Sequence, residues 1–234
     1  MTILIYPRNA WNDHFPGTSP TTTLSSQTPT SRQTPSGSNV YVSNCLFGPI
    51  SSSSEGGALC CSSSATYLVV ESSSFFSCKT SSGNGGAILF YHSSGQCVLY
   101  RVCGYDCCCG SRGMFSYITV SNTASSKSYI NYSSIARCVT GSTSILDSSA
   151  YQNGKVCCPS VNTSLNQCYR MIGITCWPTK DSSSVTCSLT YSTFANNHAT
   201  GYNCLMLCTS GANFEIKCCN ILRNTQVSLN EQAT

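Results

Sequence analysis

The sequence predicts an all-β fold: a single-stranded, right-handed parallel β-helix with about 30 residues in each coil. Three observations carry this prediction. Small polar residues recur at a nearly constant interval, an apolar residue stands three positions before each of them, and no apolar stripe of helical period and useful length occurs. A fixed period in this range is typical of stacked units that bury their apolar faces against their neighbours.

The recurring polar residues predict a structural ladder at one corner of the coil. They follow one another at a spacing of about 30 residues, and Cys45 fits as an earlier copy one slightly longer interval upstream. The recurring residues are Cys78, Cys108, Cys138, Cys168, Asn197 and Asn224. The apolar residues three positions earlier are Phe75, Tyr105, Ile135, Leu165, Phe194 and Ile221. Successive coils lie about 4.8 Å apart, so we expect Asn amides to hydrogen-bond up the stack and Cys to fill the same corner as stacked thiols.

Each copy also contains short strands. Residues ten and eight positions before the ladder are mostly apolar, and this i, i+2 spacing predicts a strand with one buried face. These pairs are Leu68 and Val70, Val98 and Tyr100, Ser128 and Ile130, Cys158 and Ser160, Cys187 and Leu189, and Phe214 and Ile216. Another apolar group follows the ladder in most copies, and corners rich in Ser, Gly, Asn and Thr separate the strands. The pattern predicts two or three strands per coil.

Two copies carry a glycine pair before an apolar strand. Gly56-Gly57 and Gly85-Gly86 each precede Ala and then Leu or Ile. A corner that feeds a strand needs either a positive φ angle or close approach of the neighbouring coil, and glycine permits both. Gly-Gly-Ala-[Ile/Leu] and the Phe-x-x-Asn sequence that ends at Asn197 resemble the paired repeats of the polymorphic membrane protein family of bacterial autotransporters, and of similar cysteine-rich β-helix proteins of parasitic protists. The resemblance covers about residues 40 to 225. It implies a right-handed β-helix displayed at a cell surface, with adhesion as its role.

The chain divides into three parts. Residues 1–38 are rich in Ser, Thr and Pro and lack apolar periodicity, which predicts a disordered leader. The repeats fill 39–226 and predict about seven coils, and 227–234 form a polar tail. No run of 18 apolar residues occurs, which predicts that the chain has no membrane span.

Composition restricts the classes of function. Charged residues make up 9% of the chain, against roughly 25% in ordinary soluble proteins. The net charge of +4 comes from scattered single residues, so we expect no nucleic-acid partner. The 19 cysteines include no Cys-x-x-Cys pair, and vicinal cysteines on a strand point to opposite faces. We therefore expect no metal and no cofactor, and a mainly structural role for the thiols.

Catalytic groups do not fall into a pattern. Asp106, Asp147 and Asp181 occupy different positions relative to the ladder, so they are not expected to stack as polyuronide-cleaving β-helices require. The three histidines lie far apart in the repeat scheme, and Arg137 should face away from Cys138. These observations favour a protein that is not an enzyme.

Two features could serve binding or display. Exposed aromatic residues would form a stacking stripe for sugars, with Tyr117, Tyr129, Tyr151 and Trp177 as candidates; burial of these side chains is the alternative. Asn131 and Asn162 begin the two N-glycosylation sequons, and they stand about one repeat apart, which predicts that they lie on the same side of adjacent coils.

The sequence thus predicts a non-enzymatic, surface-exposed or secreted repeat protein that contacts cell-surface glycans or proteins. The alternative is a carbohydrate-active β-helix, similar to pectate lyases, with a degenerate site. An enzyme of that kind would release reducing or unsaturated ends from polyuronides, whereas an adhesin would bind cells and release nothing. A third interpretation is an incomplete gene product with no independent role.

Overall fold

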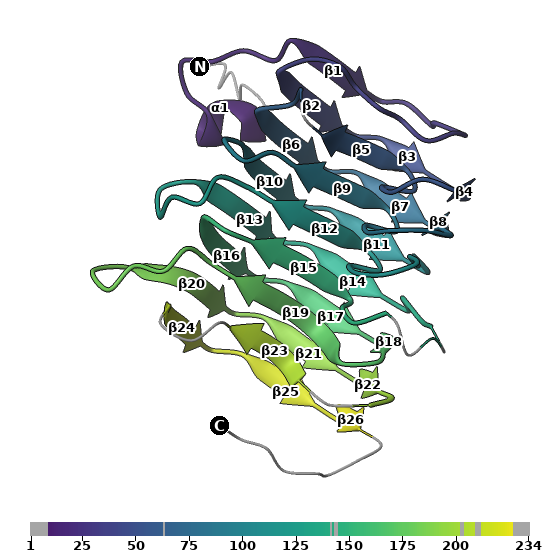
Figure 1. The fold of residues 1–234 in the computed structure, drawn as a ribbon, viewed down its shortest axis with the longest axis vertical. Helices are drawn as coiled ribbons and strands as arrows, with labels where there is room; N and C mark the ends of the chain where they lie inside the picture. Colours follow the sequence, from purple (N-terminus) through teal and green to yellow (C-terminus); the bar gives the residue numbers. More distant parts are fainter. Residues whose placement is uncertain are drawn as a thin grey trace, which may run out of the picture.

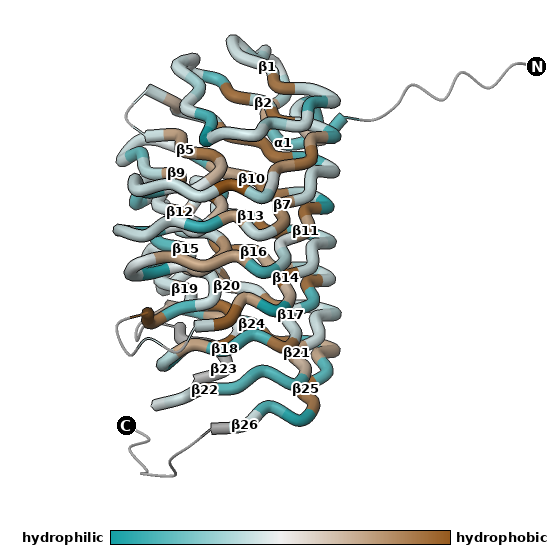
Figure 2. The backbone as a smooth tube through the Cα atoms, turned by 90° about the vertical axis from the view of Figure 1, so that its right-hand side faces the viewer, coloured by the Kyte–Doolittle hydropathy of each residue, from teal (hydrophilic) through white to brown (hydrophobic). Residues whose placement is uncertain are grey.

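The computed structural model describes residues 9–62, 64–140, 142, 145–201, 204–208 and 212–226. These residues form a right-handed parallel β-helix whose coils descend in order from the N-terminal to the C-terminal end (Figure 1). Seen from the side, the coils stack as a column from β1 to β26 (Figure 2). The predicted fold class is confirmed.

Three long parallel sheets run the length of the stack, and we call them A, B and C. Sheet A holds β1 (Thr22–Ser25), β2 (Asn39–Ser43), β6 (Tyr67–Glu71), β10 (Gln96–Tyr100), β13 (Lys127–Asn131), β16 (Lys155–Pro159), β20 (Val185–Thr190) and β24 (Asn213–Lys217). Sheet C holds β3 (Leu46–Phe47), β7 (Ser74–Phe76), β11 (Cys103–Tyr105), β14 (Ser134–Ala136), β17 (Asn162–Ser164), β21 (Thr193–Ala195) and β25 (Asn220–Leu222). Sheet B holds β5 (Leu59–Ser62), β9 (Ile88–Tyr91), β12 (Ser116–Thr119), β15 (Ser149–Gln152), β19 (Met171–Trp177) and β23 (Cys204–Cys208).

Each coil passes from sheet A to sheet C and then, through a further short segment and a loop, to sheet B. The short segments pair as β4 (Ile50–Ser52) with β8 (Cys78–Thr80), and as β18 (Gln167–Cys168) with β22 (His198–Ala199) and β26 (Thr225–Gln226). Sheet B has six strands, so six coils among the described residues contribute to all three long sheets.

Single residues in the left-handed region make the two tight corners of the coil. Their φ angles lie between 47° and 57°. Between sheets A and C these residues are Ser26, Asn44, Ser72, Arg101, Tyr132, Ser160, Tyr191 and Cys218; after sheet C they are Ser77, Asp106, Arg137, Leu165, Asn196 and Arg223. A left-handed residue turns the chain sharply, so the residue after it can point into the interior.

The register differs from the predicted one in two coils. The inward column of sheet C is Phe47, Phe75, Gly104, Ile135, Thr163, Phe194 and Ile221. Tyr105 and Leu165, which a constant spacing assigned to this column, are 37% and 51% exposed. Successive coils contain different numbers of residues: the step from Phe75 to Gly104 is shorter than the step from Gly104 to Ile135. A constant period therefore assigns some residues to the wrong column. A slip of one residue on a strand moves a side chain to the opposite face.

The same slip affects sheet A. Its inward pairs are Val40 and Val42, Leu68 and Val70, Cys97 and Leu99, Ser128 and Ile130, Val156 and Cys158, Cys187 and Leu189, and Phe214 and Ile216. Val98 and Tyr100 therefore face outward, and Ser160 is a left-handed corner residue. Four of the six predicted pairs occupy the predicted face.

The N-terminal segment differs from the predicted disordered leader. Helix α1 (Ala10–His14) lies on the outer face of sheet A, where Trp11 and Phe15 are buried in a cluster with Val69 and Val98. Strand β1 adds to the edge of sheet A through backbone pairing with β2, which requires no apolar periodicity. Residues 1–8 of the leader and the predicted tail 227–234 lie outside the described residues.

Candidate functional site: a groove on the outer face of sheet B

The inward ladder is the most regular polar feature of the interior. The structure places Ile50, Cys78, Cys107, Cys138, Asn166, Asn197 and Asn224 in this column. Asn166 Nδ2 donates to Asn197 Oδ1 at 3.0 Å, and Asn197 Nδ2 donates to Asn224 Oδ1 at 2.9 Å. Each of these amides also donates to a sheet C carbonyl of the preceding coil, as Asn197 Nδ2 does to Thr163 O at 3.0 Å. The side chains thus bond neighbouring coils together in the interior.

Cysteine replaces asparagine in the first half of the ladder. The Sγ atom of Cys78 donates to Phe47 O, and that of Cys107 donates to Phe75 O, both at 3.6 Å. These are the carbonyls of the column to which the Asn amides donate in later coils. The hydrogen bond to Cys107, together with burial, raises the pKa of Cys138 well above its ordinary value. A thiol held neutral and fully buried has a structural role.

Three predicted ladder residues lie elsewhere. Cys45 belongs to the first corner column, in which its backbone N–H donates to Ser73 Oγ at 3.1 Å. Cys108 lies one residue after the ladder residue of its coil, where its backbone forms a β-bridge with Lys79 and its side chain is half-buried. Cys168 is buried, but it stands two residues after Asn166, in β18. The predicted ladder positions Cys78, Cys138, Asn197 and Asn224 lie in the ladder itself.

The glycine pairs perform two different tasks. Gly56 and Gly85 have φ angles of +65° and +69°. Gly57 and Gly86 permit close approach of the next coil: a Cβ atom on Gly86 would lie 2.1 Å from the carbonyl oxygen of Met114. The first glycine of each pair therefore turns the chain, and the second lets two coils touch.

The sequons do not share one side of adjacent coils, contrary to the prediction. Asn131 ends β13 in sheet A and is 8% exposed, whereas Asn162 begins β17 in sheet C and is exposed. In the next coil, Asn131 corresponds to Pro159, which ends the sheet A strand. The corner at Ser160 follows, so Asn162 already lies in sheet C. Their difference in exposure follows from this difference in sheet.

The carboxylates are separate from one another. Asp106 lies at a corner and accepts from Ser77 Oγ at 2.6 Å; partial burial acts to raise its pKa, but hydrogen bonds from Ser77 and Lys79 outweigh that effect and lower the pKa. Asp181 lies in an exposed loop, where hydrogen bonds from Ser183 and Ser184 lower its pKa to about 2. Asp147 is fully buried beside sheet B. Among the described residues, no cluster of His, Cys, Asp and Glu could hold a metal ion.

The aromatic candidates divide between three environments. Tyr117 and Trp177 lie half-buried on the outer face of sheet B. Tyr151 is fully buried in the interior, and Tyr129 lies on sheet A beside α1, within 5.9 Å of the His14 ring. Only two of the four therefore share one face.

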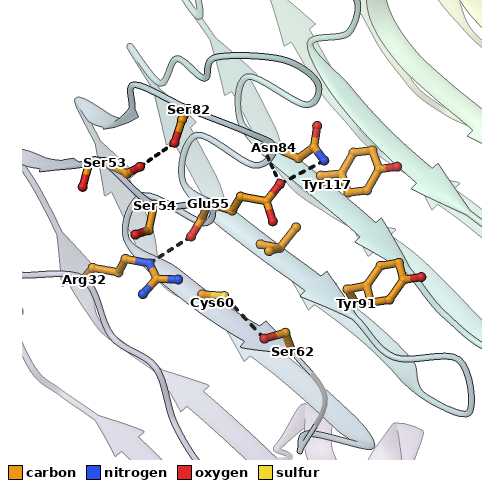
Figure 3. Close-up of a pocket in the computed structure, with 11 residues that line it drawn as sticks. Arg32, Ser53, Ser54, Glu55, Cys60, Ser62, Ser82, Asn84, Tyr91 and Tyr117 are labelled. Carbon is orange, nitrogen blue, oxygen red and sulfur yellow. Dashed lines mark hydrogen bonds between the residues drawn. The ribbon is translucent and has the colours of Figure 1, made fainter.

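A groove of about 610 Å³ lies on this outer face of sheet B, and Figure 3 shows its lining. Cys60 and Leu89 line it from β5 and β9, and Tyr91 and Tyr117 stand on one side. Loop residues that precede the strands stand on the other side. The lining residues are Arg32, Ser53, Ser54, Glu55, Cys60, Ser62, Ser82, Asn84, Leu89, Tyr91 and Tyr117.

A chain of polar side chains, which we call the rim, borders the groove and continues beyond it. Arg32 Nε donates to Glu55 O at 2.9 Å, and Asn84 donates to Glu55 Oε1 from its backbone N at 3.1 Å and from Nδ2 at 3.2 Å. Arg112 N donates in turn to Asn84 Oδ1 at 3.2 Å. Each rim residue is thus held by a residue of the neighbouring coil.

The rim ends at a buried ion pair. Arg112 Nε lies 2.7 Å from Asp147 Oδ2, and Thr175 Oγ1 donates to Asp147 Oδ1 at 2.7 Å. The guanidinium carbon of Arg112 lies 4.2 Å above the Trp177 ring. Burial raises the pKa of the nearby Tyr117 hydroxyl, which keeps that group a neutral donor and acceptor.

The arrangement joins apolar and polar surfaces. Leu89 and the two tyrosine rings offer apolar contact, while Glu55 and Arg32 offer a hydrogen-bond acceptor and donors. Sequence reasoning missed the rim, although Glu55, Asn84 and Arg112 each stand directly before a glycine of positive φ, at Gly56, Gly85 and Gly113. This repeated pair, a polar residue followed by glycine, was the sequence signal that could have identified the rim.

Comparison with protein-family models, curated proteins and solved structures finds no match to this chain. Among the described residues, α1 is the one helix, and it is far too short to cross a membrane.

Proposed function

We propose that this chain is a non-enzymatic β-helix protein, displayed at a cell surface or secreted, that attaches to glycans or proteins of cell surfaces through the outer face of sheet B. The observation that carries the proposal is the groove, in which two tyrosine rings stand opposite a polar rim. A small number of placed polar groups over an apolar floor is typical of binding sites. The rigid stack holds them in position without a conformational change.

The positions of the carboxylates favour binding over hydrolysis. Glu55 and Asp147 border the same face, but they stand in the first and fourth coils of sheet B. Three coil steps separate them by about 14 Å, whereas paired glycosidase carboxyls lie roughly 5 to 9.5 Å apart. Arg112 and Thr175 also engage both oxygens of Asp147.

Cell attachment tests the proposal. Purified protein is labelled and its binding to epithelial cells is measured by flow cytometry, for the wild type and for Tyr91→Ala with Tyr117→Ala. We expect the double variant to lose attachment. Tyr191→Ala, which removes a 69% exposed ring from a corner outside sheet B, is the matched control and should bind as the wild type does.

Two results would reject the proposal. One is attachment that the double variant retains in full while circular dichroism shows an intact fold. The other is release of reducing or unsaturated ends from polyuronides by the wild type, which would favour the carbohydrate-active alternative.

A further inference from the structure

We infer that the groove on sheet B binds an uncharged oligosaccharide whose chain lies along the axis of the stack. This inference rests on the proposed function, because it assigns a ligand class to the same face. Three properties of the groove carry it: its ring faces, the balance of its charges and the direction in which its residues repeat.

The aromatic wall suits a sugar ring. Tyr91 is 57% exposed and Tyr117 is half-buried, and they come from adjacent strands of sheet B. Pyranose rings have an apolar C–H face, and a tyrosine side chain offers an apolar ring with a polar tip. Leu89 and Cys60 also line the groove, although both side chains are largely buried.

The rim supplies hydrogen-bonding groups held in place before any ligand arrives. Both bonds from Asn84 go to Glu55 Oε1, and among the described residues no bond is made to Glu55 Oε2. Arg32 uses its Nε atom on the backbone carbonyls of residues 55 and 56, and within the same part of the chain its two Nη atoms have no acceptor. An acceptor and a planar set of donors thus stand ready for hydroxyl groups.

The charges of this face are balanced. Arg32 and Glu55 stand together at one end, and Arg112 and Asp147 form an ion pair further along. An acidic or sulfated polymer would need a surplus of Lys and Arg here, and a basic ligand would need a surplus of carboxylates. The face therefore favours a ligand without net charge.

The repeat sets the direction of the ligand. Cys60, Leu89 and Tyr117 occupy one register column, and Ser62, Tyr91 and Thr119 occupy the next. Both columns run across the strands, parallel to the stacking axis. Outward side-chain positions therefore recur along that axis at about 4.8 Å for each coil, and the groove residues from successive coils follow this direction, which suits an extended chain better than a compact ligand.

Isothermal titration with defined oligosaccharides tests the inference. The probes are neutral hexamers of glucose, galactose, mannose and N-acetylglucosamine, with oligogalacturonate and a sulfated oligosaccharide as charged comparisons. We expect one neutral hexamer to bind with an affinity that does not change with salt, and Tyr117→Ala to weaken it about tenfold. Glu55→Gln retains an amide oxygen for Asn84, so it should weaken binding while thermal unfolding stays unchanged.

Three outcomes overturn the inference: binding of the charged probes alone with an affinity that falls as salt rises, binding of a neutral hexamer that both groove variants retain, or no binding of any neutral hexamer. The experiments distinguish failure of the proposed cell attachment from failure of the proposed oligosaccharide ligand. If groove-dependent cell attachment survives periodate treatment of the cells, attachment is correct and the sugar ligand is wrong. If a neutral hexamer binds the groove but cells are not bound, the reverse holds.

Discussion

Replacing Asn197 with alanine tests whether hydrogen bonds of the inward ladder hold the coils together. Asn197 is fully buried and takes part in four side-chain hydrogen bonds. Its Nδ2 donates to Thr163 O and Asn224 Oδ1, and its Oδ1 accepts from the backbone N and Nδ2 of Asn166. Alanine removes all four.

The magnitude follows from which partners lose their hydrogen bonds. Asn166 Nδ2 keeps Ile135 O, and Asn224 Oδ1 keeps the backbone N of residue 197. Asn166 N–H and the Thr163 carbonyl lose the bond that the side chain supplied. A buried N–H left without an acceptor costs about 1 to 3 kcal/mol, and the bond lost at Thr163 O, whose residue also pairs within sheet C, costs about 1 kcal/mol. We therefore expect a loss of about 3 kcal/mol in the free energy of unfolding.

Urea unfolding followed by circular dichroism measures this loss, with two comparison variants. Asn224→Ala removes similar bonds in the last described coil, where the side chain is only half-buried, so water replaces them and the loss should be about 1 kcal/mol. Asn197→Cys should lose less than Asn197→Ala, because a thiol can donate to Thr163 O as Cys107 does to Phe75 O. Equal losses for the two alanine variants would refute the reasoning.

Three other predictions follow from the described contacts. Gly86→Ala should destabilise the fold severely, because its Cβ would lie 2.1 Å from a carbonyl oxygen, whereas Gly17→Ala meets no atom within 4 Å and should cost about 1 kcal/mol through its positive φ alone. Thermal unfolding compares the two, and similar melting points would contradict the packing. Burial, and then the charge of Lys127, lowers the pKa of His14, so docking of α1 should be complete above the unfolded-state pKa near 6.5 and weaken as pH falls through the folded value. Tryptophan fluorescence measures this docking, and His14→Gln should remove the pH dependence; a variant that keeps it would show that another group titrates. Expressed in a secretory host, the exposed Asn162 should carry a glycan and the buried Asn131 should not, and mass spectrometry showing the reverse would contradict the assigned faces.

Many details of the repeat were predictable because the same chemistry recurs in each coil. Cys78, Cys138, Asn197 and Asn224 could be placed in one column from spacing alone, since Cys or Asn occupies every position of this column after Ile50. The glycine pairs were equally visible, because a missing side chain shows directly in the sequence.

The exact register between coils was not predictable. Longer and shorter loops compensate for one another, so the repeat length stays nearly constant while individual residues shift by one or two positions. Cys107 and Asn166, rather than Cys108 and Cys168, occupy the ladder, although both predicted residues satisfied the constant period. Hydrogen bonds between coils decide the register, and they depend on which residue takes the left-handed corner. Asp106 and Leu165 take it in these two coils.

The sequence by itself determined that the chain forms a stack of β coils with a polar inner corner, because a one-dimensional repeat shows directly in residue spacing. Only the tertiary structure decided what covers the outer faces. Helix α1 has five residues, and Trp11 is buried in a cluster on sheet A that includes Val69 of β6 and Val98 of β10. The rim and tyrosine wall of the groove likewise join loops and strands of neighbouring coils. The pairs of a polar residue and a following glycine mark where the rim residues stand, but the stacking of the coils decides which residues they contact.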